Sequence, residues 1–111
     1  FISFDVNGAA AATVSRIATP NFFTGDVTVS SVGGPGRYDF TIASFKGPLG
    51  YASVFPVIQF SSGTGVGTVP VVFVTSTAGY APGSDSCTFA IGVNSGLVAT
   101  VGSFSVFVLA Y

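Results

Sequence analysis

The chain has 111 residues, of which 49% are hydrophobic, 14% are aromatic and only 6% are charged, and its net charge is −1. This length fits one domain that covers residues 1–111, and the charged fraction is about a quarter of the average for soluble domains. The few scattered charges exclude the basic footprint of a nucleic-acid-binding protein or of a protein that adheres to anionic membranes.

Such a chain has too few polar side chains to cover its own surface. A folded monomer of this size buries roughly 65% of the surface of its unfolded chain and leaves the rest exposed. The longest apolar runs, residues 54–58, 69–74 and 104–110, fall well short of the roughly 20 residues that a membrane helix needs. We therefore expect no membrane insertion, and we expect a protein interface to cover the apolar surface.

Strand patterns recur along the whole chain, and no window has the apolar period of a helix. In chain order, we expect strands at residues 1–6, 12–18, 26–32, 37–45, 51–60, 69–75, 87–93 and 97–111. Turn signals rich in Gly, Pro, Asn and Ser separate these segments about every ten residues. The sequence therefore predicts an all-β fold, an antiparallel β-sandwich or jelly-roll-like domain of about seven or eight strands.

Two kinds of side-chain pattern occur among the predicted strands. Residues 37–45 alternate apolar and polar side chains, which is typical of a strand with one face in the core and one in water. Residues 51–60 and 69–75 are apolar at odd and even positions alike, so we expect one face to meet the core and the other a neighbouring subunit. Together with two positions on the last strand, the predicted interface residues are Val54, Phe55, Val57, Ile58, Val71, Val72, Phe73, Val74, Phe104 and Phe107.

The residue types that most catalytic and metal sites require are scarce. The chain contains no histidine, which removes Ser-His-Asp and Cys-His nucleophilic sites and most zinc or iron sites. We expect no catalytic residue, no cofactor and no metal site. Three of the four aspartates, Asp5, Asp26 and Asp85, have the context of turns, and Asp39 lies on a water-facing strand side. A pair of aspartates in a glycan-cleaving enzyme is the catalytic alternative.

Three further features have both a structural and a chemical interpretation. Cys87 is the only cysteine, so no intrachain disulfide can form. We expect it to be buried on a strand, the alternative being a reactive or intermolecular thiol. The glycines of residues 63–67 precede a strand rather than a helix, which favours a hairpin loop over a phosphate-binding loop. Exposed Tyr51, Tyr80 and Tyr111 would be able to stack on sugars, although packing in the core or an interface is their usual role.

Several segments together resemble the C-terminal β domains of bacteriophage tail fibres. The resemblance lies in GDVTVSSV at residues 25–32, GRYDFT at 36–41 and YASV at 51–54. It extends to the opening FISFDVNG at residues 1–8 and to the closing segments CTFAIGV at 87–93 and FSVFVLAY at 104–111. The match covers nearly the whole chain. This chain departs from those domains in being far more apolar and in lacking the histidine-based metal-binding repeats of some fibre tips.

The resemblance implies a trimer whose outer loops contact a host surface molecule, either a glycan or a protein. We accordingly expect a non-catalytic structural subunit of a virion or extracellular appendage whose main partner is another copy of itself, in a trimer or a filament. The alternative is a carbohydrate-binding module that presents loop aromatics to a glycan. The chain begins at Phe1 rather than Met, which is typical of a processed product or a fragment.

Overall fold

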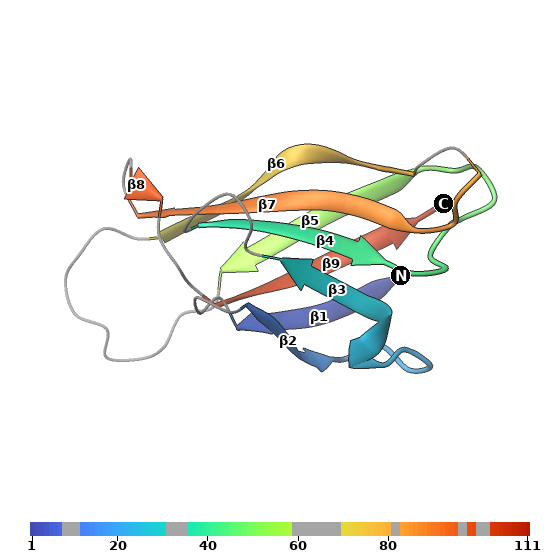
Figure 1. The fold of residues 1–111 in the computed structure, drawn as a ribbon, viewed down its shortest axis with the longest axis horizontal. Coiled ribbons are helices and arrows are strands. Elements are labelled where there is room, and N and C mark those ends of the chain that lie inside the picture. Colours follow the sequence, from blue (N-terminus) through green and yellow to red (C-terminus); the bar gives the residue numbers. More distant parts are fainter. Residues whose placement is uncertain (8–11, 31–35, 59–69, 81–82, 96–97, 100–102) are drawn as a thin grey trace.

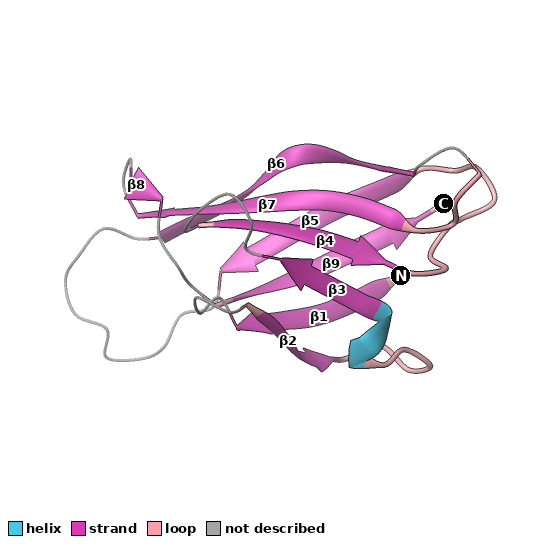
Figure 2. Ribbon diagram, in the orientation of Figure 1, coloured by secondary structure: helices cyan, strands magenta, loops and turns pink. Residues whose placement is uncertain are grey.

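The computed structural model describes residues 1–7, 12–30, 36–58, 70–80, 83–95, 98–99 and 103–111. Within these residues the chain forms nine strands and one short 3₁₀ helix (Figures 1 and 2). The elements are β1 (Ile2–Asn7), β2 (Thr13–Ile17), η1 (Thr24–Asp26), β3 (Val27–Ser30), β4 (Arg37–Ile42), β5 (Ala52–Ile58), β6 (Pro70–Tyr80), β7 (Cys87–Ser95), β8 (Val98–Ala99) and β9 (Phe104–Ala110). The predicted all-β antiparallel sandwich is confirmed, with nine strands where seven or eight were expected.

Two antiparallel sheets face each other. The first has the strand order β2-β1-β9-β5, and the second has the order β3-β4-β7-β6 with β8 paired to β7. The first and last strands of the chain are neighbours at the centre of the first sheet, where Ile2 lies opposite Val108 and Val6 opposite Phe104. This sheet therefore forms only when the two ends of the described chain meet.

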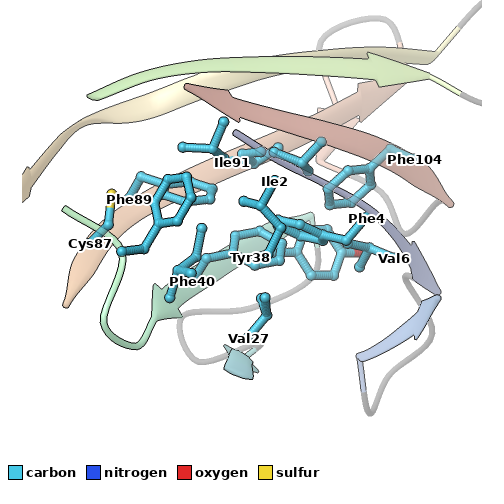
Figure 3. Close-up of a cluster of buried hydrophobic side chains, with 14 of the residues drawn as sticks. Ile2, Phe4, Val6, Val27, Tyr38, Phe40, Cys87, Phe89, Ile91 and Phe104 are labelled. Carbon is cyan, nitrogen blue, oxygen red and sulfur yellow. The ribbon is translucent and has the colours of Figure 1, made fainter. Parts of the chain in front are cut away.

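Side chains alternate between core and surface along the central strands. On β1 the even positions Ile2, Phe4 and Val6 are buried, while Ser3 and Asp5 are half-buried and Asn7 is exposed. The same period of two appears on β4 and β9, as the pleat of a strand requires. The buried cluster of Figure 3 fills the space between the sheets, and none of the described polar or charged residues is buried.

Aromatic rings join the two sheets across this core. Phe40 of the second sheet has its ring centroid 5.6 Å from that of Phe4 and 6.2 Å from that of Phe104, both in the first sheet. Phe89 stacks on Phe40 at 5.1 Å, and Tyr38 lies 5.2 Å from Phe104. Each such pair stabilises the fold by about 0.5–1.5 kcal/mol beyond the area that it buries.

The sandwich has two free edges on one side, formed by β5 and β6. Cα atoms of these strands approach within 8 Å, although each strand ends its own sheet. On β5, Tyr51 and Tyr111 exchange both backbone hydrogen bonds at 2.9 Å, so alternate residues from Tyr51 onward pair with β9. Pro56 is not one of these residues, so its backbone nitrogen points to the free edge of the sheet. Proline, which has no N–H, is tolerated there.

The largest differences from the predicted strands are three. β6 continues through Gly79 to Tyr80, where a turn was expected, because register shifts after Val74 and Ser76 accommodate the extra residues. The predicted final strand 97–111 is two strands, β8 and β9. β4 ends at Ile42 rather than at Phe45, since Ser44 adopts a positive φ of 51°. The predicted hairpin loop at 63–67 lies outside the described residues.

A loop glycine is expected to be required for the C-terminal strand to dock. A Cβ added at Gly47 would lie 2.5 Å from the backbone nitrogen of Tyr111, whereas one added at Gly25 would meet nothing within 4 Å. Gly47→Ala should therefore lower the free energy of unfolding by about 1–3 kcal/mol through overpacking. Gly25→Ala is the matched control and should change it by less than about 0.5 kcal/mol. Chemical denaturation at one protein concentration measures both, and equal stabilities would contradict the close approach.

Candidate interaction surface

The outer side of the first sheet carries a group of exposed and half-buried apolar side chains, named here the aromatic face. It comprises Phe1, Tyr51, Phe55, Val57, Phe107, Leu109 and Tyr111. On β5 and β9 these residues have the opposite parity to the buried ones, so strand pleating points them away from the core. Phe55 and Val57 remain 51% and 58% exposed.

Ring contacts order the aromatic face. Phe107 lies between two other rings, with its centroid 4.9 Å from that of Phe1 and 6.0 Å from that of Phe55. Beside this row, the rings of Tyr51 and Tyr111 lie 5.9 Å apart. The result is a broad apolar surface made of rigid side chains, which lose little conformational entropy when they are covered.

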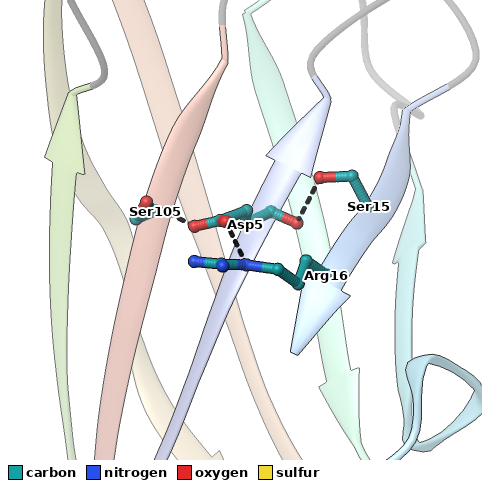
Figure 4. Close-up of polar contacts among 4 residues, drawn as sticks. All are labelled: Asp5, Ser15, Arg16 and Ser105. Carbon is teal, nitrogen blue, oxygen red and sulfur yellow. Dashed lines mark hydrogen bonds and ion pairs between the residues drawn. The ribbon is translucent and has the colours of Figure 1, made fainter. Parts of the chain in front are cut away.

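A polar cluster on β1, β2 and the start of β9 lies on the same outer side of the sheet (Figure 4). Arg16 Nε donates to Asp5 Oδ2 at 3.1 Å, and Ser105 Oγ donates to Asp5 Oδ1 at 2.7 Å. Ser15 Oγ donates to the backbone oxygen of Asp5 at 3.3 Å. Because the Arg16 side chain is largely exposed, the ion pair contributes at most about 1 kcal/mol to stability. The cluster marks where the outer side of this sheet becomes polar.

Charge is distributed unevenly over the sandwich. The seven charged residues all lie in the described part of the chain, on β1, β2, β4, η1 and loops. The sequences of β5, β6, β7 and β9 contain none. Free strand edges in soluble proteins are usually protected by charges. The residues of β5 and β6 themselves contribute no charge to this protection.

A second apolar surface, the β6 strip, lies on the other sheet and consists of Val71, Phe73 and Val74. Phe73 covers Gly92 of the neighbouring strand, since a Cβ added at Gly92 would lie 2.6 Å from its Cζ. Val71 shares the outward parity of Phe73. Val74 pairs with the buried Ile91 but is itself 39% exposed, next to the register shift. Val71 and Phe73 thus share the outer side of β6, a strand that ends its sheet, whereas Val74 has the parity of the core.

The structure divides the predicted interface residues between the two sides of each strand. Phe55, Val57, Val71, Phe73 and Phe107 point outward, whereas Val54 and Val72 are partly buried against the core.

Not every predicted interface position points outward. Phe104 is wholly buried, so its assignment to an interface is replaced by a place in the core. The Ile58 side chain lies outside the described residues. The sequence reasoning missed Phe1 and Leu109, and the odd parity that Leu109 shares with Phe107 was the signal for it.

The predicted place of Cys87 on a strand in the core is confirmed, and the thiol is free. Its neighbour across the ladder is Tyr80, whose hydroxyl is buried without a hydrogen-bond partner among the described residues. Tyr80 was expected to be exposed, but it packs against the core and under Lys46 Nζ, 5.5 Å from the ring centroid. Burial raises the pKa of both the Cys87 thiol and the Tyr80 hydroxyl.

The aspartates occupy separate structural positions. Asp5 is on β1 rather than in a turn, and Asp39 pairs with Arg37 at 3.2 Å on the wet side of β4, as expected. Asp26 Oδ2 accepts a hydrogen bond from the Phe23 N–H at 2.8 Å in a turn, as its context predicted. The Asp85 backbone oxygen accepts a hydrogen bond from the Phe45 N–H at 2.8 Å.

Two kinds of site have no candidate in the described residues. No three His, Cys, Asp or Glu side chains there are grouped closely enough to hold a metal ion. None of the described helices has the length and apolar character needed to cross a membrane.

Comparison with known proteins adds no relative. No protein-family description, curated protein or solved structure matches this chain.

The buried thiol predicts how stability changes with pH. The folded state holds the Cys87 pKa above its ordinary value of 9.0, so above about pH 9 the unfolded chain loses this proton while the folded chain keeps it. The free energy of unfolding should therefore fall as the pH rises from 9, after a plateau below it. Denaturation curves across this range should give a shallower decline for Cys87→Ala than for the parent. Identical slopes would contradict the assignment.

Proposed function

We propose that this chain is a non-catalytic structural subunit that assembles with copies of itself, as part of a virion or extracellular appendage of the tail-fibre kind. The observation that carries the proposal is the aromatic face. Its exposed rings and aliphatic side chains present on the order of 600 Å² of apolar area. This equals or exceeds the largest patch of a typical monomer, about 300–600 Å².

The area is also in the range that association requires. A stable interface buries about 800 Å² on each partner, of which the centre is apolar and the rim polar. The aromatic face would supply such a centre, and the Asp5–Arg16 cluster with Ser105 would lie at its rim. A second copy of a chain this poor in charge is the partner that matches the surface.

The sequence pattern supports a place in a virion or extracellular appendage. The order of strand motifs resembles phage tail-fibre domains, in which subunits assemble and outer loops reach a host surface. The second sheet has a polar outer side at β4, where Arg37 and Asp39 are exposed to water. That side would remain the solvent-facing surface of an assembly and would be free for a host glycan or protein.

Light scattering coupled to size-exclusion chromatography tests the proposal. The parent should elute as an oligomer at micromolar concentration, and Phe55→Asp should weaken association by at least about 100-fold, because a charge at the centre of an apolar contact is left unpaired. Circular dichroism should show that Phe55→Asp keeps its sheet structure, since Phe55 is half exposed.

Two control variants separate assembly from folding. Thr13→Asp, on the same side of the sheet at the β2 edge, should leave the oligomer unchanged. Val106→Asp, at a wholly buried position on β9, should abolish folding. A parent that is monomeric at micromolar concentration would overturn the proposal.

A second candidate is a carbohydrate-binding module, and one observation favours it. The exposed rings of Tyr51 and Tyr111 lie side by side, and the Tyr111 hydroxyl is 3.3 Å from Ser53 Oγ. Aromatic faces with adjacent hydroxyl groups suit stacking on a sugar. A glycan array probed with the parent and with Tyr51→Ala should then give a signal only for the parent. Absence of a signal from the parent would remove this candidate.

A further inference from the structure

We infer that Phe107 acts as a positioning residue in the proposed contact between copies, because its ring holds the rings of Phe1 and Phe55 in the arrangement that a second copy meets. The inference rests on the proposed function and names the residue that prepares its surface. It applies to any symmetry of the contact.

The strand register places Phe107 in the middle of the aromatic face. It lies opposite Phe55 of β5 on one side and opposite Ser3 of β1 on the other. Phe1 is two positions before Ser3, so it lies diagonally across from Phe107, at a distance that aromatic side chains span. Residues near the centre of an interface are the ones that usually determine its affinity.

Phe107 is the shared neighbour of two rings that do not contact each other. No other ring in the described part of the chain contacts Phe1 or Phe55. The Phe1 ring stacks on that of Phe107 at an interplanar angle of 28°, and the Phe55 ring is tilted against it at 50°. Phe1 and Phe55 are 63% and 51% exposed, whereas Phe107 is half-buried. A partner would therefore touch mainly the two outer rings, and Phe107 determines how these rings are oriented.

Ring contacts of this kind favour association because they order the side chains in the free subunit. A mobile side chain that becomes ordered in an interface weakens binding by roughly 2- to 10-fold. The strand pairing fixes the backbone of Phe55, and Phe1 precedes the first residue of β1, but the orientation of both rings depends on Phe107. Without the Phe107 ring, we expect Phe1 and Phe55 to contribute less to association than they do beside it.

A double-mutant cycle on the full chain tests the inference. Analytical ultracentrifugation measures the association constants of the parent, Phe55→Ala, Phe107→Leu and the double variant, and leucine keeps an apolar side chain while removing the ring. We expect Phe55→Ala to weaken association about 30-fold and Phe107→Leu about 10-fold. The double variant should be weakened about 30- to 50-fold, whereas independent effects would give about 300-fold. Circular dichroism should show the sheet structure of the parent in all three variants.

A control cycle separates positioning from a general loosening of the sheet. Tyr51 belongs to the aromatic face, but among the described residues its ring contacts only that of Tyr111. Tyr111 is four positions from Phe107 along β9, or about 13 Å. The effects of Tyr51→Ala and Phe107→Leu should therefore multiply within about twofold.

The remaining outcomes contradict the inference. It is wrong if the first double variant is weakened by more than about a third of the product of the two single effects. It is also wrong if either Phe55→Ala or Phe107→Leu leaves association unchanged, or if both cycles show equal coupling, which a general loosening would produce. A monomeric parent would overturn the proposed function and the inference with it, whereas an oligomeric parent with independent effects would overturn the inference alone.

Discussion

The pairing of β1 with β9 is the constraint on which the rest of the structure depends. It places Ile2 opposite Val108 and Val6 opposite Phe104 at the centre of the first sheet, so the core rings Phe4 and Phe104 face Phe40 of the other sheet. The same register fixes the outer side, where Phe1 stacks on Phe107. One long-range ladder therefore orders both the core and the aromatic face. Contacts of this kind cost loop-closure entropy before they stabilise the fold, and they are typical of slowly folding sandwiches.

Period-two alternation in the sequence was sufficient to predict the fold class and the buried side of β4. It was insufficient where both parities are apolar, because neither parity then identifies the core. Phe104 and Phe107 illustrate the difficulty: both are aromatic residues of one strand, and only pairing with β1 and β5 determines that Phe104 is buried and Phe107 points outward. The length of β6 was also underestimated, since a glycine that resembles a turn is accommodated by register shifts against β7.

The absence of histidine and the scarcity of charge were the main basis for the expected function. The structure shows where the charged and the apolar side chains lie. Most of the charged side chains interact with near neighbours. Four of them form two surface ion pairs, and Asp26 accepts a hydrogen bond in a turn. The apolar excess collects instead on the outer side of one sheet and along β6. Sequence alone did not indicate that the two surfaces would lie on different sheets, because that depends on which strands end each sheet.

The proline on β5 limits the way in which copies of this sandwich can join. Backbone groups at the free edge of a strand are a template for another strand, and continuous templates lead to extended cross-β polymers. Pro56 interrupts the donors along the outer edge of β5 at the middle of the strand. A neighbouring chain cannot complete a regular ladder there. An association of copies at this edge would therefore rest on side-chain contacts rather than on a continued backbone ladder, which disfavours growth into amyloid-like aggregates there.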